Sequence, residues 1–194
     1  MTEQTMLEKL KGMVDEKRYA HSIGVRDTAA MLARRYGVSE EKARIAGILH
    51  DCAKNIPKDE GIARCEAAGI RLKPICYIEK GLVHSYLGAH IAKTEFGITD
   101  REILDAIYYH TTGHEDMPLL TKIIYLSDLI EPGRNVPNVE ELRRIAMDDI
   151  DEALIRSINS TIAHVLGKGS ILDCDTVCAR NFLVQQKRLC ESAV

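Results

Sequence analysis

Residues 43–51 read ARIAGILHD, an apolar segment with helical character that ends in a histidine and an aspartate. Neighbouring residues on a helix point about 100° apart, so His50 and Asp51 can meet at one ion only where that ion lies at the end or edge of the helix. A carboxylate beside buried aliphatic side chains costs several kcal/mol unless a cation pairs with it. The stretch therefore predicts a bound metal or a paired acid.

Helical periodicity covers nearly the whole chain, and strand-like alternation is almost absent. We predict ten helices, over residues 4–16, 18–36, 39–52, 57–68, 84–96, 99–110, 117–131, 138–147, 150–166 and 173–191. We find neither an internal repeat nor a linker. The fold class is therefore predicted to be all-α, a single helical bundle over residues 1–194. A core of about 18–134 carries the chemical motifs, and C-terminal helices of about 138–191 pack on it.

The composition is that of a soluble globular protein, with 194 residues, 45% hydrophobic and 28% charged. A net charge of −3 lacks the basic footprint of a general nucleic-acid binder. No segment approaches the roughly 18 apolar residues of a membrane span. The charged N-terminus, MTEQTMLEKLKGMVDEK, has no signal-peptide core. We expect a cytoplasmic protein that binds neither nucleic acid nor membranes.

Two further residues extend the pattern around His50 and Asp51. His21 lies on the inward face of its predicted helix; alone it reads as a core histidine, but beside a His-Asp pair it reads as a second imidazole ligand. Asp128 interrupts the apolar run LLTKIIYLSDLI of residues 119–130, so we expect it to be buried and to need a cation. An ion pair with an arginine is the alternative to a metal.

Two more histidines stand at the ends of apolar helical faces. His84 begins one predicted helix and His110 ends another. Each can bind a second metal or donate a hydrogen bond to a phosphate, and a core or capping role is the alternative. The remaining histidines, His90, His114 and His164, lack comparable context and read as surface or structural residues.

The loop of residues 167–170, GKGS, separates the last two predicted helices. Its backbone N–H groups can hold a phosphate. The loop lacks the strand and the upstream glycine of a P-loop. It therefore reads more readily as a helix–helix turn.

The order His21, His50-Asp51, His84, His110, Asp128 resembles that of the HD-domain superfamily of metal-dependent phosphohydrolases. Four segments are similar to its YqeK-type bacterial branch, the symmetrical diadenosine tetraphosphate hydrolases. They are RYAHS at 18–22, LHDCAK at 49–54, HTTG at 110–113 and SDLIEPGR at 127–134. The resemblance runs over most of the chain, and the C-terminal helices are its least distinctive part.

The resemblance implies a divalent metal held by His21, His50, Asp51 and Asp128. Iron is the family's choice, and the same donors suit manganese or zinc. A second metal is left open. The implied reaction is hydrolysis of diadenosine tetraphosphate to two ADP by metal-activated water, with an ADP- or GDP-like product. Substrate would be bound by the following residues: Lys54, His84, His110 and Arg134.

Other functions stay open at this stage. The substrate of such a phosphohydrolase or phosphodiesterase can instead be a deoxynucleoside monophosphate or a guanosine tetraphosphate-like alarmone. The domain can also be a nucleotide-binding module without catalysis, although a pure binder needs no water-activating metal. Lys54 and Arg134 can be solvated surface cations. The sequence leaves a homodimer undecided.

Overall fold

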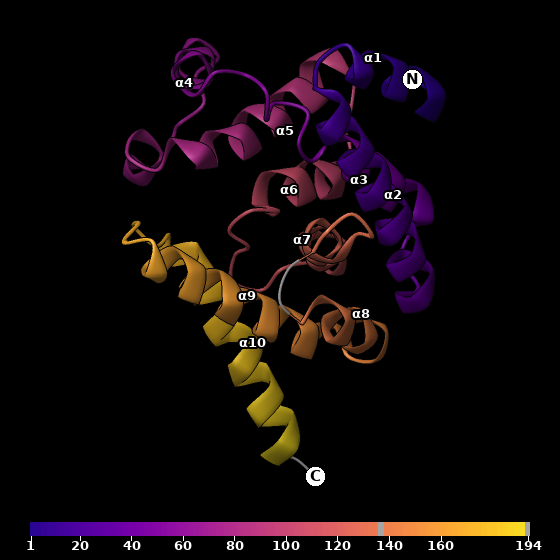
Figure 1. Ribbon diagram of the computed structural model, residues 1–194, viewed down its shortest axis with the longest axis vertical. Helices are drawn as coiled ribbons and strands as arrows, with labels where there is room; N and C mark the ends of the chain where they lie inside the picture. Colours follow the sequence, from indigo (N-terminus) through magenta and orange to yellow (C-terminus); the bar gives the residue numbers. More distant parts are fainter. Residues whose placement is uncertain (136–137, 193–194) are drawn as a thin grey trace.

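The computed structural model describes residues 1–135 and 138–192 and forms a bundle of α-helices without a strand in that part of the chain (Figure 1). The helices are α1 (Glu3–Lys11), α2 (Glu16–Tyr36), α3 (Glu40–Leu49), α4 (Lys58–Ala67), α5 (Val83–Glu95), α6 (Arg101–Tyr109), α7 (Leu119–Ile130), α8 (Val139–Asp148), α9 (Ile150–Gly167) and α10 (Cys174–Ser192). Two 3₁₀ turns, η1 (Pro74–Tyr77) and η2 (Lys80–Leu82), precede α5. The predicted all-α fold with ten helices is confirmed.

Local capping signals set the helix ends. Gly37 closes α2 with φ of 72°, a left-handed conformation that costs glycine little. Ser39 accepts a hydrogen bond from the Lys42 amide and starts α3. The predicted helix 4–16 is too long, because Asp15 caps α2 by accepting from the Arg18 amide at 2.8 Å. The predicted helix 39–52 likewise ends earlier, at Leu49, so His50 and Asp51 lie where the helix ends.

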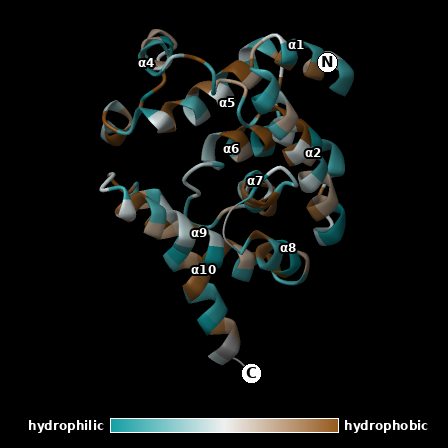
Figure 2. Cartoon of the chain, in the orientation of Figure 1, coloured by the Kyte–Doolittle hydropathy of each residue, from teal (hydrophilic) through white to brown (hydrophobic). Residues whose placement is uncertain are grey.

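Among the described residues, α2 and α3 pack against each other more extensively than any other pair of helices, and a glycine permits their close approach. A Cβ atom on Gly47 would lie 2.8 Å from the Arg26 Cα, so any larger residue would push α3 away from α2. Behind this pair, α3 also packs on α6 and α7. Hydrophobic residues line the central helices α6 and α7, including the fully buried Ile107, Ile123 and Leu126 (Figure 2). The core thus fixes the helices that carry the chemical motifs.

The C-terminal helices form the lower part of the molecule in Figure 1, where α9 packs on α7 and α10 packs on α9. The loop GKGS closes α9. The amides of Lys168, Gly169 and Ser170 donate to α9 carbonyls at 3.0–3.1 Å. Because these N–H groups are used, the loop is the predicted helix–helix turn and not a phosphate cradle. In the described residues, no helix has the length and hydropathy to cross a membrane.

Candidate metal centre

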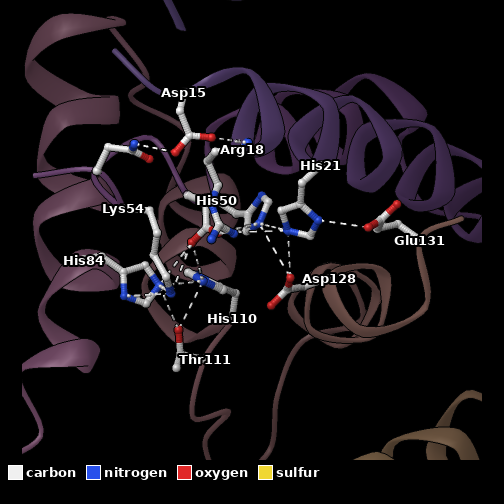
Figure 3. A network of polar contacts seen from close by, with 12 residues as sticks. Asp15, Arg18, His21, His50, Lys54, His84, His110, Thr111, Asp128 and Glu131 are labelled. Atoms are coloured by element: carbon white, nitrogen blue, oxygen red, sulfur yellow. Dashed lines mark hydrogen bonds and ion pairs between the residues drawn. The ribbon is translucent and has the colours of Figure 1, made fainter. Parts of the chain in front are cut away.

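The motif residues converge from five helices onto one place (Figure 3). His21 comes from the second turn of α2, and Asp128 from the last turn of α7. His50 and His110 cap the C-terminal ends of α3 and α6, and His84 lies in the first turn of α5. Asp51 directly follows His50. The structure therefore brings together all six residues of the sequence pattern.

His21, His50 and Asp51 form a first cluster, which Asp128 joins. The Nε2 atoms of His21 and His50 lie 3.3 Å apart. Asp51 Oδ2 lies 3.5 Å from His50 Nε2 and 3.9 Å from His21 Nε2. Asp128 Oδ1 lies 2.9 Å from His21 Nε2 and 3.9 Å from His50 Nε2. Four potential ligand atoms thus surround one point.

Asp51, His84 and His110 form a second cluster. Asp51 Oδ1 lies 3.2 Å from His84 Nε2 and 3.5 Å from His110 Nε2, and these two nitrogens are 3.1 Å apart. Asp51 therefore belongs to both clusters, with one carboxylate oxygen turned to each. This geometry suits a carboxylate that bridges two ions.

The protonation of three imidazoles follows from their backbone contacts. In each, Nδ1 lies within hydrogen-bond distance of the carbonyl oxygen three residues earlier. These pairs are His50–Gly47 at 2.8 Å, His84–Gly81 at 2.7 Å and His110–Ile107 at 2.7 Å. Because a carbonyl oxygen only accepts, Nδ1 must carry the proton, and Nε2 of the neutral ring presents a lone pair to the clusters.

This arrangement fits a divalent cation. The Nε2 lone pairs of His84 and His110 face each other and also face Asp51 Oδ1, which is buried and receives no hydrogen bond from the described residues. Lys54 Nζ and Thr111 Oγ1 can each donate to one of these nitrogens, but Asp51 Oδ1 is left without a donor. A buried carboxylate oxygen in this position is costly unless a cation lies beside it. Imidazole and carboxylate donors bind first-row divalent metals, and the donor set does not select one of them.

Glu131 supports His21 from behind, a role that the sequence interpretation missed. Its Oε1 lies 3.1 Å from His21 Nδ1, and the residue is only 5% exposed. The Gly133 amide donates to Oε2 at 2.5 Å. Gly24 makes room, since a Cβ there would lie 2.5 Å from Oε2. The signal in the sequence that could have indicated Glu131 was the acidic residue within the SDLIEPGR segment.

Three cations surround the clusters, namely Arg18, Lys54 and Arg134. The sequence interpretation did not single out Arg18. Its Nη1 donates to Asp51 Oδ2 at 2.5 Å. Lys54 Nζ lies 2.9 Å from His84 Nε2 and 3.7 Å from Asp51 Oδ1. Positive charge is thus available beside both oxygens of Asp51.

Asp128 differs from its expected state. We predicted a buried acid, but its side chain is 19% exposed. Arg134 pairs with its carboxylate and also donates from Nε to its backbone carbonyl at 2.6 Å. Asp128 therefore makes the arginine pair that the sequence offered as the alternative to a metal, and it also lies 2.9 Å from His21 Nε2.

Burial and neighbouring charges set the pKa values of the site. Burial lowers the pKa of His84 to about 4, which keeps its ring neutral at physiological pH. Burial also lowers the pKa of Lys54. For His50, burial alone would lower the pKa, but the carboxylates of Asp51 and Asp128 outweigh it and raise the value.

A cavity of about 240 Å³ opens beside the second cluster. Gly81 and Thr111 line its inner end, and Thr111 Oγ1 lies 3.1 Å from His110 Nε2. The other side of the cavity is formed by α9, including Thr161 and His164, and by the start of α10. The cavity therefore lies next to the second cluster through Thr111, and the C-terminal helices complete its wall.

A family model for the HD domain matches residues 18–133, and the chain belongs to the HD-domain family. Within it, the chain is closely related to bacterial symmetrical bis(5'-nucleosyl)-tetraphosphatases. It is 39% identical to the Bacillus subtilis (strain 168) enzyme, covering 95% of this chain and 98% of the relative. It is 38% identical to that of Halalkalibacterium halodurans, covering 94% and 97%. The resemblance predicted from the motifs is confirmed.

A solved structure has the same fold. It is the 1.50 Å crystal structure of a predicted HD superfamily hydrolase involved in NAD metabolism from Clostridium acetobutylicum. The two structures superimpose with a TM-score of 0.93 and 43% sequence identity, over 96% of this chain and 98% of the other. The C-terminal helices that complete the pocket are therefore part of the shared fold.

Proposed function

We propose that this protein hydrolyses diadenosine tetraphosphate to two ADP, in line with its relatives, which are named symmetrical bis(5'-nucleosyl)-tetraphosphatases. One observation carries the proposal. Two clusters of imidazoles share the carboxylate of Asp51, next to the cations Arg18, Lys54 and Arg134. Such a site can hold divalent metal and bind a chain of phosphates.

In this proposal, His21, His50, Asp51 and Asp128 hold a first metal, and His84 and His110 with Asp51 hold a second. We propose iron on the strength of the family resemblance, with manganese and zinc suited to the same donors. Bound metal would supply Lewis acidity and lower the pKa of water toward neutrality. Glu131 keeps the His21 ring oriented for metal binding, because its carboxylate accepts a hydrogen bond from Nδ1.

The cationic side chains of this protein would neutralise the negative charge of the substrate phosphates. Arg134 offers a planar fork for two phosphate oxygens, and Arg18 and Lys54 approach from the Asp51 side. Water adds to one of the two inner phosphorus atoms, and the bond from that atom to the central bridging oxygen breaks. The bridging oxygen leaves with one ADP, and the oxygen of water stays on the other. These cations would stabilise the charge on the transferred phosphoryl group.

The direct test is turnover in oxygen-18 water. Protein loaded with iron, manganese or zinc is incubated with diadenosine tetraphosphate, and the products are separated by chromatography and weighed by mass spectrometry. We expect two ADP molecules, one of which carries a single label. ATP plus AMP would refute the symmetrical cleavage. No turnover with any of the metals would reject it in favour of another nucleotide substrate or of a binding module.

A further inference from the structure

A second, larger cavity of about 560 Å³ lies between the end of α7 and the helices α8 and α9. It shares Thr161 and His164 of α9 with the cavity of about 240 Å³ beside the second cluster. It also reaches Leu129, which directly follows Asp128 on α7. The two cavities therefore share part of α9 as a lining, and each reaches a residue next to the metal centre, Thr111 beside His110 in the smaller and Leu129 beside Asp128 in the larger. We refer to the two cavities together as the groove.

The larger cavity has the lining that a nucleoside needs. Leu129, Leu142 and Ile145 provide apolar surface. The arginine in its lining, Arg156, donates to the carboxylates of Glu141 at 2.7 Å and of Glu152 at 2.8 Å, so its positive charge is balanced. Hydroxyl and amide groups of α9 supply hydrogen-bond partners. Ligand pockets of several hundred Å³ typically combine such an apolar lining with a few polar groups.

Charge is distributed along the groove as it is along a dinucleoside polyphosphate. The cations Arg18, Lys54 and Arg134 gather at the metal centre, whereas the larger cavity is close to neutral. A substrate of this class carries its negative charge in the middle and an uncharged nucleoside at each end. The smaller cavity can take only one of them.

We propose that the larger cavity binds the second nucleoside of a dinucleoside tetraphosphate, an inference that rests on the proposed function. His164, which the sequence interpretation placed among surface or structural residues, stands where the two cavities meet. A cleft for each nucleoside holds the inner phosphates over the clusters and favours cleavage into equal halves.

The test fills the larger cavity without touching the core. Ser160 is exposed on α9 and lines the larger cavity but not the smaller one, so Ser160→Trp places an indole where the nucleoside would lie. Ala163 is exposed on the same helix and lines neither cavity, so Ala163→Trp is the matched control. Asn159→Trp fills the larger cavity from the adjacent position and serves if the first variant folds poorly.

Two quantities are measured on manganese-loaded protein: kcat/KM for diadenosine tetraphosphate, and the dissociation constant of ADP by titration calorimetry. We expect Ser160→Trp to lower kcat/KM by about tenfold or more, because the second nucleoside loses its place. ADP binding should change by less than about twofold, since ADP keeps the smaller cavity. Ala163→Trp should leave both quantities at the wild-type values.

Two results would overturn the inference while the proposed function stands. One is an unchanged kcat/KM in Ser160→Trp and Asn159→Trp. The other is a loss of ADP affinity in Ser160→Trp that is as large as its loss of kcat/KM, which would mean that the indole disturbs the whole site. A wild-type protein that does not cleave diadenosine tetraphosphate would instead reject the proposed function, and the inference with it.

Discussion

Glu131→Gln removes one negative charge behind His21 and keeps a side chain of the same size. In the structure Glu131 Oε1 lies 3.1 Å from His21 Nδ1, and the carboxylate is almost fully buried. A carboxylate in this position orients the ring and makes Nε2 a stronger donor. Losing such a partner typically weakens metal binding by about 10–100-fold, or about 1.4–2.8 kcal/mol.

The geometry places two variants at different ends of this range. Glutamine keeps one oxygen that can accept a hydrogen bond from His21 Nδ1, but its NH2 group cannot accept from the Gly133 amide as Oε2 does. The charge and that second hydrogen bond are lost while the His21 contact stays, so we expect about tenfold weaker binding in Glu131→Gln. Alanine removes the acceptor and also leaves the Gly133 amide without its partner. We therefore expect about 100-fold weaker binding in Glu131→Ala.

The assay is a titration of metal-free protein with manganese, in which free Mn²⁺ is quantified by its electron paramagnetic resonance signal. Glu8→Gln removes the same charge from an exposed site on α1 and is the control. Thermal unfolding establishes that each variant is folded. If Glu131→Gln and Glu131→Ala bind manganese within twofold of Glu8→Gln, the argument that Glu131 tunes His21 is wrong.

Three further predictions concern the same centre. Gly24→Ala should weaken manganese binding in the same direction as Glu131→Gln, because its Cβ would meet Glu131 Oε2 at 2.5 Å; the same titration measures it, and wild-type affinity would show that the carboxylate has room to move. Asp128→Asn should weaken metal binding by more than the roughly 10–100-fold expected for the loss of a residue that only supports a ligand, as Glu131 does. Measurement of the metal content after dialysis would reveal this loss. His84 stays neutral when folded because burial lowers its pKa from 6.5 to about 4, so the unfolded chain binds its proton more readily. Its contribution to stability is complete above pH 6.5 and is lost as the pH falls toward 4; urea unfolding of metal-free protein should show this decline, and His84→Gln should flatten it.

The sequence by itself determined the helices, because the signals that start and stop them are local. Periodicity sets the inward face, and Gly37 and Ser39 mark a boundary through their own backbone and side-chain contacts. The tautomers of His50, His84 and His110 are local too, since each Nδ1 meets a carbonyl oxygen three residues earlier. The order of the motifs was enough to indicate the family.

Only the tertiary structure decided which faces meet and how closely. Glu131 lies 110 residues beyond the His21 that it supports, and Arg18 lies 33 residues before Asp51. Periodicity gives the direction of a side chain but not the neighbour it finds, which depends on how helices pack, as at Gly47 against α2. For the same reason the sharing of Asp51 between two clusters, and the groove along α9, required the assembled bundle.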